Sequence, residues 1–434
     1  MSSEAAVSSR QNYRTRWLYF GLYGWMQCAG RFMGLYYRNE GLTDAEIGWV
    51  FAAGCIITPG ISSALNYLAD RAAAKHGSGI RLWFFAAYIV VGTMAFACQA
   101  VAVAYPILGV SHFWLMLVCR IPLSAAFSGG NSLLDAVTVQ GLRDRRDYGK
   151  ERLYGAYSWA IVGLGLGILM DNCAMNTRVM NFAFPVAALI LLAATAGTGA
   201  PPAQTESDSD LTAELPAARD CEQDGATVSG SAFCELLRTY ATSAVTVSFF
   251  LFAVLLGIGM ALVENLIFLY FEDLHASYTV CGLSVVVTVI FEIPFFAVAP
   301  KMLQTLGREG FLSVAGLCWI VRGVGYTLIP GGAWILLFEP LHGVTYAAWQ
   351  TSSVELMASI TPPHLSASGQ TFLASVRTLL GTATGNLFGG MVIDRFGEAA
   401  LYRGVAVLVA FGLFQYLFIS RLSRRRTNLA AAPV

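Results

Sequence analysis

Twelve long apolar runs follow one another along this chain of 434 residues, and they constrain its fold more than any other feature. Each run reaches the length of about 20 residues that a helix needs to cross a bilayer, and a spanning helix satisfies its own backbone hydrogen bonds. The chain is therefore predicted to be an all-α membrane protein with twelve transmembrane helices. The runs cover about residues 17–37, 45–68, 82–104, 108–138, 153–172, 179–199, 243–271, 278–299, 310–329, 333–358, 367–391 and 401–420.

The composition agrees with a lipid environment and excludes several classes of protein. Only 12% of the residues are charged, where a soluble domain carries roughly 25%. The 27 Lys and Arg balance the 27 Asp and Glu, so no basic field favours nucleic acid. The nine cysteines form no CxxC pair, and no nucleophile motif or phosphate-binding loop is present. We therefore expect no enzyme activity, no metal site and no cofactor.

The distribution of basic residues predicts the orientation in the membrane. With the N-terminus in the cytosol, 19 Lys and Arg fall in the inner segments and four in the outer segments. The positive-inside rule then puts both termini in the cytosol. The first run is too long and too polar at its far end for a cleaved signal peptide, and the sequence NLAAAPV carries no lipidation or retention signal. The plasma membrane is the default location, and an organelle membrane stays open.

A polar segment divides the runs into six and six. Residues 200–232 are rich in small and acidic residues and have almost nothing to bury, which predicts a disordered cytosolic linker, with partner binding as the alternative. Two six-helix bundles related by an axis along the membrane normal fit this division. The predicted parts are an N-terminal bundle (1–199), an acidic linker (200–240), a C-terminal bundle (241–422) and a cytosolic tail (423–434).

Nine charged side chains lie inside the predicted spans. On insertion scales each costs about 2.5–3.5 kcal/mol at the bilayer centre, so they must face a polar interior. They form either a static set of interhelical ion pairs or a water-filled pathway that binds solute and protons. Because the charges occur in both halves of the chain, the pathway is favoured. With His342 beside them, the nine are Arg31, Arg120, Asp135, Glu264, Glu292, Arg322, Glu339, Glu355 and Arg377.

The tenth span carries a polar and aromatic face. Glu339, His342, Tyr346, Trp349 and Ser353 recur at spacings of three or four, so they share one side of a helix. A histidine with a carboxylate one turn away can titrate near neutral pH, which indicates proton coupling. The alternative is a hydrogen-bonded core histidine.

Glycines at four-residue steps predict close helix packing in two spans, since a groove of small residues admits a neighbouring helix. In the eleventh span the stripe is in line with Arg377, whose charge must be paired within the bundle. The glycines are Gly163, Gly167, Gly381, Gly385 and Gly389.

Asp135 in the fourth span and Arg152 and Trp159 in the fifth form the candidate solute site. A spacing of seven keeps Arg152 and Trp159 on one helix face. A carboxylate and a guanidinium can bind hydroxyl or amide groups, and an indole can stack on a ring. The alternative is a cytoplasmic gate salt bridge with an interfacial tryptophan.

At these residues the sequence resembles the major facilitator superfamily, and within it the lactose permease-like branch of oligosaccharide/proton symporters with the associated domain of eukaryotic homologues. The resemblance implies that Asp135, Arg152 and Trp159 contact a sugar-like solute. The stretch GLTDAEIGWVFAAGCIITPGISSALNYLADR resembles the family's second helix and its gating loop, which would hold Asp70 and Arg71.

The resemblance also implies a proton-coupling network in the second half of the chain. Thr345 stands where the family has its proton-accepting glutamate, and Val289 stands at its eighth-helix acid. Glu292, three residues after Val289 on roughly the same face, and Glu339, one turn before His342, are expected to take over the proton. The predicted network consists of Glu264, Glu292, Arg322, Glu339, His342 and Arg377.

The predicted function is secondary active transport of a small polar solute, such as a sugar or nucleoside, by alternating access with proton coupling. Its partners are the solute, H+ and the lipid bilayer. One alternative is an uncoupled facilitator or exporter on the same fold. The other is a transport-inactive receptor or scaffold that binds protein partners. The substrate, the direction of transport and the oligomeric state stay open at the sequence level.

Overall fold

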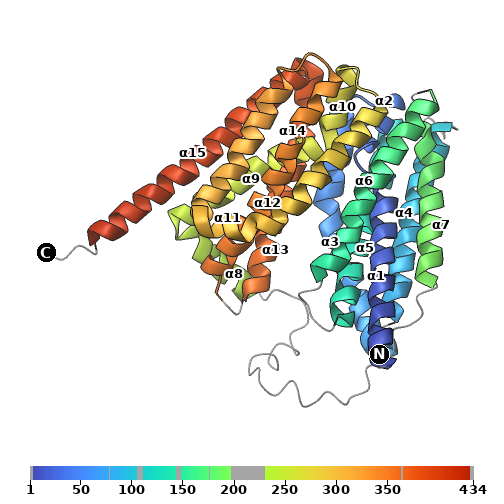
Figure 1. The fold of residues 1–434 in the computed structure, drawn as a ribbon, viewed down its shortest axis with the longest axis horizontal. Helices are drawn as coiled ribbons and strands as arrows, with labels where there is room; N and C mark the ends of the chain where they lie inside the picture. The colour runs from blue at the N-terminus through green and yellow to red at the C-terminus, as the bar shows by residue number, and fades with distance from the viewer. Residues whose placement is uncertain are drawn as a thin grey trace.

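The computed structural model describes residues 3–77, 79–104, 111–142, 148–174, 176–196, 230–362 and 365–430, and every regular element in these ranges is helical (Figure 1). The helices before the polar segment are α1 (Ser3–Gln27), α2 (Met33–Asn39), α3 (Asp44–His76), α4 (Ile80–Ala104), α5 (His112–Gly141), α6 (Tyr148–Asn172), η2 (Thr177–Val179) and α7 (Met180–Ala196).

The helices after the polar segment include two π-helical segments, η3 and η6. In chain order they are α8 (Gly230–Ala241), α9 (Ala244–Ala261), η3 (Leu262–Leu266), α10 (Ile267–Asp273), α11 (Tyr278–Tyr326), η4 (Gly332–Leu337), α12 (Pro340–Ile360), α13 (Ser366–Val376), η6 (Arg377–Thr382), α14 (Ala383–Phe396) and α15 (Glu398–Ala430).

Each predicted apolar run coincides with a helix or with a series of consecutive helices, so the all-helical membrane class is confirmed. Eight helices in the described residues are long and apolar enough to span a membrane by length and composition. The count of twelve is not confirmed, because several runs are interrupted and α11 joins two of them. Inside α11, Gly307 has φ 69° and ψ 170°, a left-handed conformation that glycine adopts without steric cost and that turns the chain between the two runs.

The structure adds helical segments at two of the predicted connections. The predicted linker 200–240 contains α8, in which Tyr240 is buried and its hydroxyl lies 2.7 Å from that of Thr361. Residues 197–229 lie outside the described residues. The expected gating loop at Asp70 and Arg71 is instead part of α3, because helical geometry continues to His76 and the chain first leaves it at Gly77. The connection to α4 is therefore residues 77–79.

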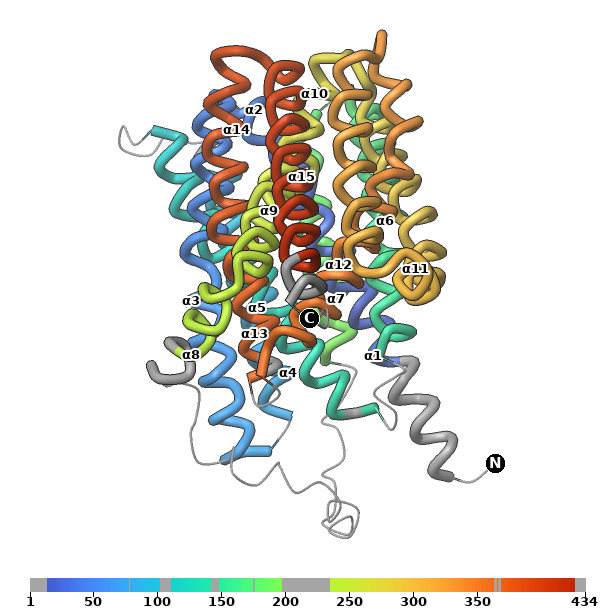
Figure 2. Tube along the Cα trace, turned by 90° about the vertical axis from the view of Figure 1, so that its left-hand side faces the viewer, coloured from blue at the N-terminus to red at the C-terminus, as the bar shows by residue number. Residues whose placement is uncertain are grey.

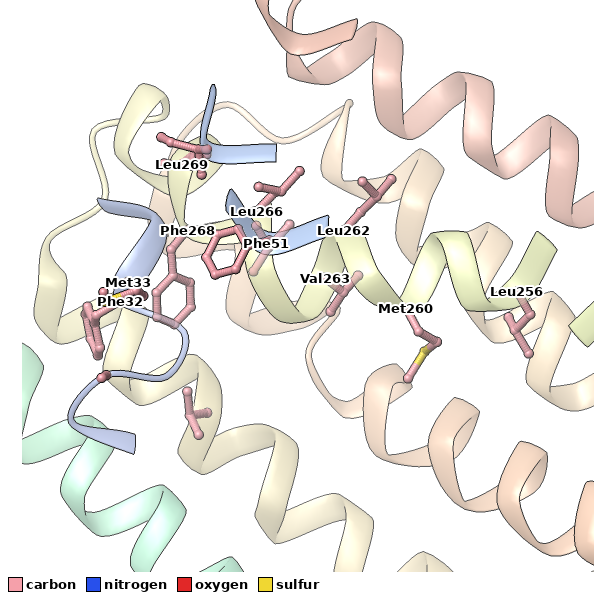
Figure 3. Packing of buried hydrophobic residues seen from close by; sticks show 14 of the residues in the cluster. Phe32, Met33, Phe51, Leu256, Met260, Leu262, Val263, Leu266, Phe268 and Leu269 are labelled. Atoms are coloured by element: carbon pink, nitrogen blue, oxygen red, sulfur yellow. The ribbon is translucent and has the colours of Figure 1, made fainter. Parts of the chain in front are cut away.

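Helices α1 and α4–α7 run side by side and α15 is inclined to them, with α2 and α10 at one end of the molecule and the N-terminus at the other (Figures 1 and 2). We call these the α2 end and the N-terminal end. At the α2 end, the ring of Phe32 lies edge-on against Phe268, with centroids 4.9 Å apart, and Met33 lies beside them (Figure 3). Apolar side chains from the first and second halves of the chain thus share one core there.

Glycines make the close helix contacts that the sequence predicts. A Cβ on Gly381 would lie 2.9 Å from the carbonyl oxygen of Val254, and one on Gly385 would lie 2.9 Å from that of Ile258. Any larger side chain would push α9 away from η6 and α14. A Cβ on Gly167 would lie only 2.2 Å from the carbonyl oxygen of Tyr278, so α6 and α11 touch backbone to backbone. The prediction of glycine packing is confirmed.

Candidate functional site

A sealed ion pair lies between α11 and α12. Arg322 Nη2 is 3.0 Å from Glu339 Oε2, and both side chains are 1% exposed. The Tyr326 hydroxyl donates a hydrogen bond to Glu339 and accepts one from Arg322 Nε. Thr288 donates a second hydrogen bond to Glu339, to Oε2 at 2.9 Å. On the other side of the pair, His342 Nδ1 lies 2.6 Å from Arg322 Nη1. Both charges are compensated, as buried charges must be to persist away from water.

The packing of α12 on α11 sets the position of a second acid. A Cβ on Gly343 would lie 2.6 Å from the backbone nitrogen of Glu292, so the two helices meet directly at these residues. Glu292 itself is half-buried and forms no ion pair or hydrogen bond with the residues that the structure describes. Gly343 thus brings an uncompensated carboxylate next to the sealed pair.

Two further charges lie in the π-helical segments. Glu264 lies in η3 and Arg377 in η6, and π-helical turns occur often at functional sites. Both side chains are half-buried, and within the described part of the chain neither forms an ion pair. These two and Glu292 are the predicted network residues that keep a free charged group.

The predicted solute site has the geometry of a hydrogen-bonded cluster. Arg152 Nη1 donates to Asp135 Oδ2 at 2.9 Å and to the hydroxyl of Tyr148 at 2.8 Å. Tyr19 donates to Asp135 Oδ1 at 2.7 Å, and Asn131 donates to Oδ2 at 3.3 Å. Since the side chain of Arg152 is 41% exposed and that of Asp135 25%, the pair is accessible, unlike the pair of Arg322 and Glu339.

Trp159 adjoins this cluster through Tyr23. The two rings meet edge to face with centroids 6.3 Å apart, and the guanidinium carbon of Arg152 lies 5.8 Å from the centroid of Tyr23. A Cβ on Gly30 would lie 3.1 Å from the Trp159 ring, so the turn between α1 and α2 passes directly beside the indole. Asp135 of α5 and Arg152 and Trp159 of α6 are thus joined through a few contacts.

Tyr346 connects the charges of the two halves. Its ring is stacked on His342, with centroids 6.5 Å apart. The charges that act on its hydroxyl come from Glu292, Glu264 and Arg377 in the second half and from Arg152 in the first. Because electrostatic interactions weaken with distance, Tyr346 lies within range of charged side chains from both halves of the chain.

Two carboxylates close the α2 end by binding helix N-termini. Asp171 at the end of α6 accepts from the backbone N–H groups of Tyr278 (3.0 Å) and Thr279 (2.8 Å) at the start of α11. Asp394 near the end of α14 accepts in the same way from Asp44 (3.1 Å) and from the residue after it (3.0 Å) at the start of α3. A negative charge at a helix N-terminus is stabilising because the first N–H groups lack partners within the helix.

Arg38 adds ion pairs between the same two sets of helices. It lies 2.8 Å from Asp44, 2.9 Å from Asp273, 3.4 Å from Glu398 and 3.5 Å from Glu272. The described side-chain hydrogen bonds that join residues 3–196 to residues 230–430 lie at this end. The one exception among them is a 3.6 Å contact between the side chains of Asn386 and Cys55. The structure is therefore held closed at the α2 end.

Other candidates have a packing role or lie at the surface. Trp349 is 3% exposed and stacks on Phe249, with centroids 5.7 Å apart. Glu355 pairs with Arg308 at 3.3 Å, and both side chains are largely exposed. Asp70 accepts from Arg81 Nε at 2.9 Å, near the end of α3 opposite to Asp44.

Sequence reasoning missed several residues that complete these clusters. Tyr326 follows Arg322 by four residues, a spacing that puts both on one helix face and could have indicated the contact. Tyr19 and Thr288 gave no such signal, because their acidic partners lie on other helices. Glu151 was also missed; it is buried and accepts from Arg16 Nε at 3.1 Å, which ties α6 to α1.

Comparison with solved structures defines the class of protein. The nucleoside transporter NupG superposes with a TM-score of 0.73 and 15% identity, covering 94% of this chain and 98% of that one. The D-xylose-proton symporter gives a TM-score of 0.60 at 15% identity, covering 96% and 97%. At such low identity these likenesses concern the fold alone, which this chain shares with both of these proteins.

Sequence comparison then gives the family. The model of the MFS_1 like family matches residues 13–404, so the chain belongs to this family of the major facilitator superfamily. The maltose permease of Geobacillus stearothermophilus is 23% identical over 395 residues, which cover 90% of each chain. The uncharacterized transporter YwbF of Bacillus subtilis is 28% identical over 156 residues, 34% of this chain and 38% of that one. The chain is accordingly a transporter and not an enzyme.

Proposed function

We propose that this protein is a secondary active transporter that moves a small polar solute, such as a sugar or nucleoside, by alternating access and together with protons. The observation that carries the proposal is the accessible hydrogen-bonded pair of Asp135 and Arg152, which Tyr23 joins to Trp159. An accessible hydrogen-bonding cluster and uncompensated carboxylates around one space are what a coupled solute pathway needs.

The proposal includes an arrangement in the membrane. Residues 1–199 and 241–422 form two six-helix bundles with twelve crossings in total, joined by the acidic linker 200–240, and residues 423–434 form a tail. Both termini lie in the cytosol, because the connections between the spans at the N-terminal end of the molecule hold most of the Lys and Arg residues. The α2 end then faces outward. The plasma membrane is the proposed location. In this orientation the structure is closed to the outside by Asp171, Asp394 and Arg38.

Asp135, Arg152 and Trp159 are the proposed solute-binding residues. The carboxylate accepts and the guanidinium donates, so the pair can bind neighbouring hydroxyl groups, and Trp159 offers an apolar ring face. The names of the relatives favour such a solute, since they include a maltose permease, a nucleoside transporter and a D-xylose-proton symporter.

The proposed coupling residues divide into two groups. Glu264, Glu292 and Arg377 keep charges without a partner among the described residues, so a proton that neutralises either carboxylate changes the balance around the pathway. The second group, Arg322, Glu339 and His342, is the sealed cluster, which proton binding at its carboxylate would loosen. Asp70 and Arg71 lie near the C-terminus of α3 and are proposed to gate the inner side, with Arg81 as the partner of Asp70.

Uptake into liposomes tests the proposal. The purified full-length protein is reconstituted, and a panel of sugars, nucleosides and organic acids is offered with and without an inward proton gradient. Coupled transport predicts uptake of at least one member and faster accumulation with the gradient. Uptake that is the same with and without the proton gradient would support an uncoupled facilitator.

A receptor or scaffold makes a different prediction. It would take up no panel member, and its cellular function would survive Asp135→Asn and Arg152→Ala but not deletion of residues 200–232. A transporter loses its function in both substitutions, because they remove the accessible ion pair.

A further inference from the structure

The turn between α1 and α2 holds two buried polar side chains with atoms that have no hydrogen-bond partner among the residues that the structure describes. Arg31 is 7% exposed, and its Nη1 atom forms no hydrogen bond. Gln27, the last residue of α1, is fully buried, and both atoms of its amide group are unpartnered. Buried polar groups are nearly always satisfied, so two orphans four residues apart indicate that a binding partner belongs there.

The chain leaves α-helical geometry where these side chains lie. The N–H groups of residues 29, 30 and 33 bond carbonyl groups only three residues back, and α2 begins again at Met33. Interrupted spanning helices place polar backbone and side-chain groups where a solute binds in the middle of a transporter. The turn also passes Trp159, since a Cβ on Gly30 would lie 3.1 Å from the indole ring. The orphan groups therefore adjoin the proposed solute site.

The acids around Arg31 leave its charge uncompensated. The charged groups that interact with it are Glu339, Arg322, Glu264 and Glu292. Glu339 is already bound by Arg322 and Tyr326, and Glu264 forms no ion pair with Arg31 in the described part of the chain. A carboxylate can become neutral by taking up a proton, whereas a guanidinium cannot lose its charge in a protein. Once protons occupy both Glu264 and Glu292, neither of these two carboxylates balances Arg31, and Glu339 stays bound to Arg322.

We propose that Arg31 and Gln27 bind an oxyanion group of the transported solute, so that the substrate is a small organic anion with a sugar-like body, of which a sugar acid is the simplest example. This inference rests on the proposed function and names its substrate class. The guanidinium and the amide N–H donate to the anionic oxygens, Trp159 packs against the body, and Asp135 with Arg152 binds its hydroxyl groups. The charge of the solute compensates Arg31 when the pathway carboxylates are protonated.

Three solutes with the same ring test this inference. The full-length protein in liposomes is offered radiolabelled D-glucose, D-glucuronate and D-glucose 6-phosphate under an inward proton gradient. We expect the wild type to take up glucuronate or the phosphate about tenfold or more faster than glucose, since charge-assisted hydrogen bonds are about twice as strong as neutral ones. The two anionic arms distinguish a carboxylate from a phosphate group.

Substitutions at residue 31 identify the binding group. Arg31→Gln is expected to lower uptake of the preferred anion about 10- to 100-fold and to leave the slow uptake of glucose unchanged, whereas Arg31→Lys keeps a charge and part of the preference. Arg120→Gln is the matched control, because Arg120 is another span arginine with buried unpartnered nitrogens, positioned over Phe51 and not beside Trp159. It is expected to keep the preference for anions.

The outcomes separate this inference from the function on which it rests. Equal or faster uptake of glucose by the wild type would overturn the anion assignment while transport itself stands. Equal losses of glucose and anion uptake in Arg31→Gln would show a structural role. Should Arg31→Gln fail to fold, thermal stabilisation of the wild type by glucuronate or glucose 6-phosphate but not by glucose decides the question. If none of the three solutes is transported or bound, the inference is overturned, and the wider panel decides on the proposed function.

Discussion

Asp171 accepts a hydrogen bond of 3.0 Å from the backbone nitrogen of Tyr278, although 107 residues separate them in sequence. The pair joins the end of α6 to the start of α11, and Asp394 makes the same kind of contact from α14 to the start of α3. In both contacts a carboxylate near the end of one helix binds the N-terminus of a helix from the other half of the chain. Opening the α2 end must break both contacts.

Asp171→Asn is expected to shift the protein toward states that are open at the α2 end. The substitution removes the negative charge, and a charged hydrogen bond contributes about 1.5–3 kcal/mol, so the open population should rise roughly tenfold. Cys281 is fully buried one turn after Tyr278 and reports this opening. The measurement is the rate of maleimide labelling in a variant that keeps Cys281 as its single cysteine.

Asp70→Asn serves as the control, because Asp70 lies at the other end of α3. It is expected to leave the labelling of Cys281 unchanged. Equal labelling rates in Asp171→Asn and the parent protein would show that this carboxylate does not hold the α2 end closed.

Two glycine substitutions are expected to have different effects. A Cβ on Gly282 would lie 2.6 Å from the carbonyl oxygen of Gly163 on α6, so Gly282→Leu prevents the contact between the two halves. Gly385 contacts Ile258 of α9 within the second half, so Gly385→Leu strains one set of helices. Overpacking costs typically about 1–3 kcal/mol. Gly282→Leu should therefore increase labelling of Cys281 with little loss of thermal stability, and Gly385→Leu should lower the melting temperature.

A reversed pattern would contradict this division. If Gly385→Leu opened the α2 end and Gly282→Leu only lowered the melting temperature, the contact of α6 with α11 would not be the one that moves.

Glu339→Gln is expected to destabilise the protein strongly. The substitution leaves Arg322 buried without its counter-ion, and breaking a buried pair in this way costs about 3–5 kcal/mol. The matched variant is Glu355→Gln, whose pair with Arg308 is largely exposed and should contribute no more than about 1 kcal/mol. Thermal unfolding of both variants in detergent measures the difference, and similar melting temperatures would argue that the pair of Arg322 and Glu339 is not needed for stability.

The sequence predicted the apolar helices and most of the charges that matter, because the cost of a charge in a membrane can be read from a sequence without any contact. The link between Arg152 and Asp135 was predictable for the same reason: two charges in adjacent spans need partners. The break between α1 and α2 was not predicted, since residues 28–32 lie inside the long run 17–37 and Arg31 was interpreted as a charge within a continuous span. The π-helical segments η3 and η6 were not predictable either, because tertiary packing decides where a helical turn contains an extra residue.

Glu292→Gln is expected to uncouple transport from the proton gradient. Glu292 is half-buried against Gly343, has no ion pair with the described residues and is one of the acids whose charge acts on Tyr346, so it can bind a proton without breaking a salt bridge. Gln mimics the protonated form. The variant should still exchange solute in a counterflow assay but should no longer accumulate it when the outside is made acidic.

Glu355→Gln is the control that is expected to keep proton-driven accumulation, since Glu355 lies in an exposed pair. Unchanged accumulation in Glu292→Gln would move the coupling role to Glu264 or to the sealed cluster of Arg322 and Glu339.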